Sequence, residues 1–296
     1  MEIWKRSIRV VNSQHTTIAM SEVGSTRAAG TAGAKAEKTE GGEEAINPMK
    51  EETYAFIGCL YRLRKIYKLQ GFNPDFTKKM FGPYILNKLS RWDGDIQAAV
   101  DLWCSDPAAA EEKYGHISKW DVSHVTNMKG LFRWKQRFNE DISAWDVRNV
   151  TTMRTMFDGA EAFNQPLADW AVSNVKSMKE MFSYASAFNQ PLANWDVSKV
   201  QGMREMFNGA SAFNQPICNW DVSKVEGMGS MFMNASAFNQ PLADWDVSKV
   251  KDMGYMFCCA SSFNQPLADW DVSKVVEHVH MFTACPILSE NKPRRK

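Results

Sequence analysis

The sequence contains no run of about 20 apolar residues, the length that a membrane-spanning helix requires, so we expect no membrane insertion. The first twenty residues also lack the apolar core of a secretory signal, although they carry Lys5, Arg6 and Arg9 against the single acid Glu2. This composition fits a disordered leader, with an organelle transit peptide as the alternative. The two absences together favour an intracellular protein.

An excess of charge of one sign is also lacking. The formal net charge is +1, and residues 115–289 hold 15 Lys and Arg side chains against 18 Asp and Glu. A general nucleic-acid binder would carry a basic stripe, and none runs through this region. We therefore expect a protein partner of unknown identity and no nucleic acid.

Cysteine is scarce, with six residues in 296, too few for a disulfide framework. Cys285 falls one period after the Ala260 position, close to Cys258 and Cys259, so a bridge or a soft-metal site is one interpretation. The favoured interpretation is small reduced thiols that fill alanine-sized positions.

Catalytic motifs are missing as well. The sequence has no G-x-S-x-G, no phosphate-binding glycine loop and no distinct pair of catalytic carboxylates. His278 and His280 form an H-x-H, but a metal site would need further ligands. We predict no catalytic residue, no cofactor and no resident metal.

What the sequence does contain is a strict repeat of 25 residues, marked by Trp120, Trp145, Trp170, Trp195, Trp220, Trp245 and Trp270. The best copies, Phe238–Val250 and Phe263–Val275, read FNQPLADWDVSKV. A Met-x-x-Met-Phe segment follows the first, and the same segment with His278 for the first Met follows the second. A fixed repeat of this length marks a solenoid, in which each coil buries its apolar edge against its neighbours.

Within one coil, Leu167, Trp170 and Val172 have the L-x-x-L-x-L spacing of a leucine-rich-repeat strand. The apolar residues from Val175 to Ala185 then recur every three or four positions, which indicates a short helix or 3₁₀ turn. The predicted fold is an α/β repeat solenoid of leucine-rich-repeat-like coils. Each coil would contribute a short parallel strand and a short helix, and an N-terminal helical cap would precede the first.

One asparagine column and two methionine columns run through the coils. The asparagine column is expected to form a buried amide ladder that satisfies backbone groups at a corner, and it consists of Asn139, Asn164, Asn189, Asn214, Asn239 and Asn264. The methionine columns, Met128 to Met253 and Met156 to Met281, are interpreted as core packing, with soft-metal binding as the alternative.

The chain divides into four parts. Residues 1–50 are a disordered leader and linker, 51–114 a helical region with the N-terminal cap, 115–289 a seven-coil solenoid and 290–296 a basic tail. The cap is placed at 95–114, where Asp106-Pro107 begins a helix and Gly115 ends it. The basic helix around Arg62 to Lys68 is interpreted as a core helix, with an anionic membrane or a partner groove as alternatives.

The motifs W-D-V-S-x-V-x-x-M-x-x-M-F and F-N-Q-P-L resemble the BspA-like repeat family, a domain of unknown function best known from Mycoplasma surface lipoproteins. The resemblance covers residues 115–289 and implies a leucine-rich-repeat-like solenoid and, in bacteria, adhesion or host contact. It supplies no catalytic residues. The chain departs from the pattern at Asn139-Glu140-Asp141, Ala171 and His278, and it has no lipobox cysteine.

Alternation along the predicted strand turns two acidic columns outward, with a lysine three residues after the second aspartate of each coil. A docking face for a protein partner and a solvated, self-neutralising face both fit, and calcium between adjacent aspartates is a third interpretation. The candidate partner-binding residues are Asp169, Asp196, Lys199, Asp221, Lys224, Asp244, Asp246, Lys249, Asp269 and Asp271.

The sequence thus predicts a non-enzymatic repeat protein that acts as a protein–protein interaction or adhesion-type scaffold through its stacked-strand face. An enzyme or metal-binding protein with a site not visible in the sequence is the alternative.

Overall fold

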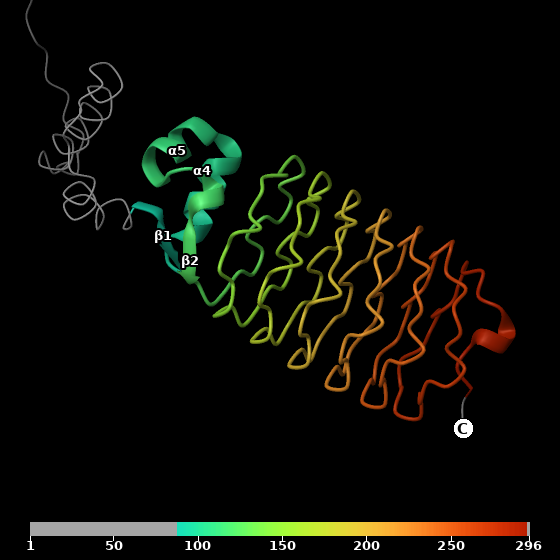
Figure 1. Ribbon diagram of the computed structural model, residues 1–296. Coiled ribbons are helices and arrows are strands. Elements are labelled where there is room, and N and C mark those ends of the chain that lie inside the picture. The colour runs from blue at the N-terminus through green and yellow to red at the C-terminus, as the bar shows by residue number, and fades with distance from the viewer. Residues whose placement is uncertain (1–87, 295–296) are drawn as a thin grey trace, which may run out of the picture. The chain divides into compact units, whose positions relative to one another are not determined.

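The computed structural model describes residues 88–294, which belong to the second of two compact units of the chain, Gly71–Lys296. The expectations for residues 1–50 and for the basic helix around Arg62 to Lys68 fall outside the described residues. In the described part, a helical segment is followed by coils that stack one after another towards the C-terminus (Figure 1).

Two helices precede the coils, as predicted. Helix α4 spans Ile96–Ser105 and helix α5 spans Pro107–Tyr114. The Asp106 side chain accepts a hydrogen bond from the Ala109 amide at 3.0 Å, and Pro107 occupies the first helical position. Gly115 ends α5 with φ 75°, a conformation that favours glycine. The start and stop signals read from the sequence are confirmed.

Helix α4 covers the first coil. Val100 and Trp103 are buried, and the Trp103 ring meets the Trp120 ring edge-on at 6.2 Å between centroids. The Gln97 side chain donates to the Leu131 carbonyl at 3.3 Å. These contacts give α4 the position of the predicted cap.

A short strand pair that the sequence did not reveal lies at the same end. Strand β1 (Ser90–Trp92) runs parallel to strand β2 (Asp121–His124). Directly after β1, the Asp93 carboxylate accepts hydrogen bonds from the amides of Thr126 and Asn127 at 2.8 and 3.0 Å. In the next coil the equivalent amide of Thr151 bonds instead to the Thr126 carbonyl. Asp93 therefore replaces the acceptor that a preceding coil would supply.

The expected strand over Leu167 to Val172 is wrong. The Trp170 amide donates to the Leu167 carbonyl at 3.1 Å and the Val175 amide to the Val172 carbonyl at 2.9 Å, so the segment is a pair of tight turns. Leu167, Trp170 and Val172 nevertheless all point into the core. The apolar spacing therefore predicts which side chains are buried, but it does not determine the backbone conformation of the segment.

The expected helix over Val175 to Ala185 is wrong for a related reason. Glu180 and Tyr184 have φ of 58° and 54°, in the left-handed region that ends a right-handed helix. The amides of Met178 and Phe182 bond to carbonyls of the next coil, those of Gly202 and Met206, at 3.1 and 2.9 Å. These amides thus form hydrogen bonds between coils and not within one coil. The same two left-handed positions recur along the stack, at Trp134, Thr155, Glu205, Ser230, Asn234, Tyr255, Cys259, His280 and Ala284 and at Gly130, Gly159 and Gly209.

The parallel pairing between coils is narrow. One residue per coil forms a β-bridge with its equivalent 25 positions away, and these residues are Asn127, Thr152, Ser177, Gly202, Gly227, Asp252 and Glu277. The chain is a tandem-repeat protein, but its coils are built from stacked turns in place of the predicted strand and helix.

Aromatic columns fill the core. Each of the seven repeat tryptophans is about 3% exposed, and the indole N–H of Trp195 donates to the Leu167 carbonyl of the preceding coil at 2.9 Å. The rings of Phe157 and Phe182 stack at 5.5 Å between centroids, and Phe182 meets Phe188 of its own coil at 4.1 Å. The core phenylalanines therefore stack along the axis as well as within a coil.

The predicted asparagine ladder is present, although its members are only partly buried. The Asn214 side-chain oxygen accepts hydrogen bonds from the Asn239 amide and from the Gln240 side chain, both at 3.0 Å. One coil earlier, the Asn189 side-chain oxygen likewise accepts hydrogen bonds from the Asn214 amide and the Gln215 side chain. The glutamine that follows each asparagine from Asn164 to Asn264 is a second rung that was not predicted from the sequence.

Replacing Asn214 with Ala should lower the free energy of unfolding by about 1–3 kcal/mol, because the Asn239 amide and the Gln240 side chain lose their acceptor. Denaturant unfolding measures the change, with Lys224→Ala at an exposed position as the control. Equal losses at the two positions would contradict the ladder.

Deleting residues 93–114 should uncover the apolar end of the first coil and promote association, because the coil loses both Trp103 and the Asp93 acceptor. Light scattering and thermal melting make the measurement, and deletion of residues 1–50 is the control. A monomeric variant as stable as the parent would show that this segment is not a cap.

Candidate functional site

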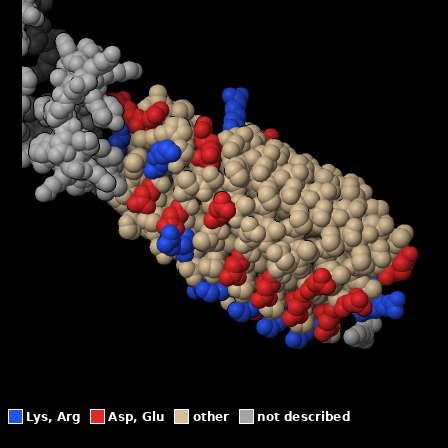
Figure 2. Space-filling model, in the orientation of Figure 1, with Lys and Arg blue, Asp and Glu red and all other residues tan. Residues whose placement is uncertain are grey.

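The candidate aspartates and lysines lie in exposed rows along the stack. Asp196, Asp221 and Asp246 occupy one row, and Lys199, Lys224 and Lys249 another, each one coil from the next. Rows of acidic and basic side chains follow one edge of the stack, and a broad area beside them is free of charge (Figure 2). The structure thus brings the candidates together as rows and not as a single converging cluster.

The aspartates of the first row have a local structural role that the sequence did not predict. The Asp196 carboxylate accepts the Ser198 amide at 3.1 Å, and Asp221 and Asp246 accept Ser223 and Ser248 at 3.0 Å. This is the Asx-turn arrangement, in which a side chain caps the backbone two residues on. The signal was available in the repeated Asp-Val-Ser.

Hydrogen bonds from Ser198 lower the pKa of Asp196, and the serines two residues on do the same for Asp221 and Asp246. Lysines contribute less: Lys199 and Lys224 lower the pKa of Asp196 through their field. The lysines were expected to offset the repulsion between the aspartates. Their effect on the pKa of Asp196 is smaller than that of the hydrogen bonds in the turn.

The lysine row also reaches between coils. The Lys199 ammonium donates to the Asn174 side chain of the preceding coil at 2.9 Å. Nearby, Lys251 and Glu226 form an ion pair across one coil interval at 2.7 Å, with both side chains more than half exposed.

The second acidic column is mixed in character. Asp169, Asp244 and Asp269 are exposed, and Asn194 and Asn219 occupy the same column. The Asn219 side chain donates to the Ala193 carbonyl at 2.8 Å. Within residues 88–294, no group of three or more His, Cys, Asp and Glu side chains is arranged to hold a metal ion.

The cysteines of the described region, Cys104, Cys218, Cys258, Cys259 and Cys285, are all free thiols. The Cys258 and Cys259 sulfurs lie 3.7 Å apart, and the Cys285 thiol faces the Phe263 carbonyl at 3.4 Å. Burial raises the pKa of the Cys285 thiol. The bridge considered from the sequence is not formed.

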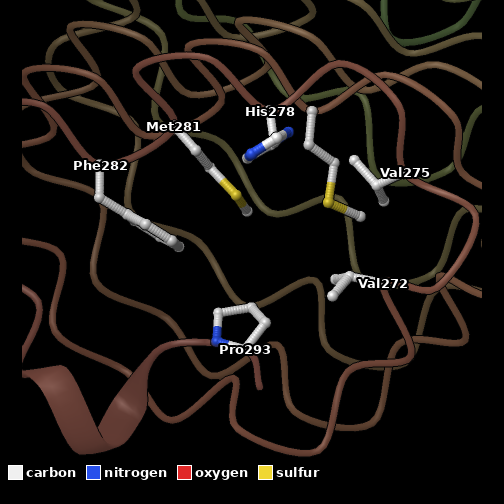
Figure 3. A pocket seen from close by; sticks show the side chains of 7 residues that line it. Val272, Val275, His278, Met281, Phe282 and Pro293 are labelled. Carbon is white, nitrogen blue, oxygen red and sulfur yellow. The ribbon is translucent and has the colours of Figure 1, made fainter. Parts of the chain in front are cut away.

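The last coil ends on a small apolar pocket of about 200 Å³ that the tail partly covers (Figure 3). One wall consists of core side chains of the last coil, on the side where a further coil would stack. Pro293 of the tail faces this wall. The lining of the pocket is Met253, Val272, Val275, His278, Met281, Phe282 and Pro293. Asn291 completes the asparagine ladder at this end, since its side chain donates to the Asn264 side-chain oxygen at 3.1 Å.

An open groove of about 520 Å³ lies between the helical segment and the first coil. It is mostly polar, and the exposed Trp134 forms part of its wall. This groove was not predicted from the sequence, because its walls come from residues 103–107 and 134–140, which no repeated motif relates to one another. Within the described residues, no helix is long and apolar enough to cross a membrane.

The stacked-turn coils, the tryptophan column and the asparagine ladder can now be compared with known proteins. The family described as Mycoplasma protein of unknown function, DUF285, matches residues 107–212 and again residues 190–293. The chain belongs to this family. The two DUF285 matches together begin at the first residue of α5 and end in the tail, so they cover α5 and the coils as one continuous region of similarity. No curated protein and no solved structure shows significant similarity to the chain.

The lowered pKa of Asp196, Asp221 and Asp246 predicts an acid-sensitive stability. The folded chain favours their ionised form, so this stabilisation is complete above the unfolded pKa of about 3.9 and is lost as pH falls through the folded pKa values. Replacing all three with Asn keeps an oxygen that accepts the serine amide but removes the titration. Urea midpoints measured downward from about pH 5 should fall less steeply in the triple variant than in the parent, and identical slopes would contradict the assignment.

Proposed function

We propose that the chain is a non-enzymatic binding scaffold for a protein partner, and that the rows of aspartate and lysine form the docking edge. The observation that carries the proposal is the regular exposure of opposite charges, with Asp196, Asp221 and Asp246 in one row and Lys199, Lys224 and Lys249 in the other. A partner with matching rows of charge would gain orientation and association rate from such a surface.

The rigidity of the row supports this proposal. The serine amides hold each carboxylate in one place, and Lys199 is anchored on Asn174. Side chains that are already ordered lose little conformational entropy on binding. The resemblance to BspA-like repeats and to their adhesive role in bacteria points in the same direction, as does the general use of repeat stacks as extended binding surfaces.

The test is partner capture by the full chain and by two charge variants. The first carries Asp196→Asn, Asp221→Asn and Asp246→Asn, and the second carries glutamine at Lys199, Lys224 and Lys249. Both should lose partners that the parent retains, and raised salt should release the same partners from the parent, because exposed charges are screened. Quantitative mass spectrometry of captured proteins makes the comparison.

The matched control changes three residues away from the charged rows. Ala187, Ala212 and Ala237 are replaced with Ser, the residue that Ser262 already provides at the equivalent position. This variant should capture the same partners as the parent. Capture unchanged in both charge variants would remove the docking function from this edge.

A further inference from the structure

Two large aromatic side chains are exposed on the coils where the core pattern gives no reason for them. Trp134 is 56% exposed and Tyr184 46%, and they occupy equivalent positions two coils apart. Both lie at the second left-handed position of the coil, with φ of 58° and 54°. Neither residue belongs to the buried aromatic columns of the core.

Glycine follows each of these rings in the next coil. A Cβ atom built on Gly159 would lie 2.2 Å from Cε3 of Trp134, and one built on Gly209 would lie 2.8 Å from Cδ1 of Tyr184. The rings therefore occupy the space above the two glycines, and any side chain there would displace them. Each ring packs against a glycine and is still about half exposed, and the Arg133 guanidinium lies 5.8 Å from the centroid of the Trp134 ring.

The two rings form a strip parallel to the axis of the stack. Neighbouring coils are 5.4 and 5.5 Å apart at the core phenylalanines Phe132, Phe157 and Phe182. Two such intervals place Trp134 and Tyr184 about 11 Å apart along the axis. Because the main-chain bonds of the coils fix the backbone under both rings, the spacing is rigid: the amides of Trp134 and Tyr184 each bond to the next coil at 2.7 Å.

Polar side chains border the strip two residues further along each coil. The Gln136 side chain donates to Glu161 at 2.8 Å, and the Ser186 and Ser211 hydroxyls donate to the carbonyls of the coil before at 3.3 Å. On the other border, Arg154 neutralises Glu180 at 3.3 Å. Beside Trp134, Arg133 pairs with Asp158 at 2.9 Å and Lys135 with Asp101 at 2.7 Å. The strip is thus a pair of exposed aromatic rings bordered by hydrogen-bonding groups and by charges that are paired with one another.

We propose that Trp134 and Tyr184 form a stacking platform for one chain of a neutral, unbranched β-1,4-linked polysaccharide. A sugar ring of this class has C–H groups on its flat faces, which pack on aromatic rings, and hydroxyl groups on its edges, which suit the polar borders. Such a chain is extended and flat, so alternate sugar rings can lie on Trp134 and Tyr184 at once.

The geometry favours a polysaccharide over a proline-rich peptide. Polyproline ligands dock into grooves between aromatic side chains, whereas each of these two rings fills the space above a glycine of the next coil. The site goes beyond the proposed docking of a protein on the charged rows, since it uses different residues and a neutral ligand.

Isothermal titration of the full chain with cellohexaose, chitohexaose, xylohexaose and mannohexaose tests the proposal, with α-linked maltohexaose and decaproline as comparison ligands. At least one β-1,4-linked hexasaccharide should bind, and its disaccharide should bind more weakly because it cannot reach both rings. Trp134→Gly and Tyr184→Gly should each weaken binding by roughly tenfold, and the double variant should abolish it.

The variants are matched to the fold. Glycine already stands at this position in the coils of Gly159 and Gly209, so its left-handed backbone is retained. Gly159→Asn, which copies Asn234 at the equivalent position, leaves Trp134 in place but pushes its ring off the platform, and it should weaken binding as Trp134→Gly does. Tyr255→Gly removes a ring of similar exposure from the other left-handed position, where Gly130 stands in the first coil, and should leave binding unchanged.

Three results would overturn the proposal. They are the absence of binding by every β-1,4-linked hexasaccharide at millimolar concentration, binding that survives the double variant, and binding of decaproline alone with the same sensitivity to Trp134→Gly. The third result would assign the strip to an extended peptide. If one glycine variant fails to unfold cooperatively, the other and Gly159→Asn decide the question.

Discussion

Main-chain hydrogen bonds between coils hold the repeat region together. In the leg from Met178 to Tyr184, alternate amides donate to carbonyls of the following coil, as the Glu180 amide does to Arg204 at 2.8 Å. Donors used between coils are not available within one, so a single coil has no regular structure of its own. The stacked phenylalanines, the tryptophan N–H bonds to the coil before and the asparagine ladder all depend on the interval that these bonds set.

Side-chain patterns in the sequence predict part of this arrangement. The period, the inward side of each coil, the role of the asparagine column and the helix signals at Asp106, Pro107 and Gly115 follow from residue types at fixed positions. The backbone conformation did not follow, because turns and a short strand or helix can bury the same apolar spacing. Glu180 and Tyr184 adopt a left-handed conformation that their residue types disfavour, and only the equivalent glycines hinted at it.

The candidate site divides in the same way. Exposure of the aspartate and lysine rows was foreseen, since residues between buried positions must face outward. The hydrogen bond from the Ser198 amide to Asp196 does not follow from a predicted strand, because a strand contains no turn that brings the two groups together. The repeat pattern does not identify Trp134 and Tyr184 either, since each differs from its neighbours in the column.

Ring and glycine alternate over four coils of the outer surface, as Trp134, Gly159, Tyr184 and Gly209, and Asn234 follows in the next coil. The residues before the glycines share this alternation, with Arg154 and Arg204 each five positions ahead. A single coil inserted between Gly159 and Tyr184 would leave every buried column intact. It would also place the two rings three coil intervals apart in place of two. The core therefore permits growth of the stack by one coil at a time, whereas the spacing of the two rings changes with every coil added between them.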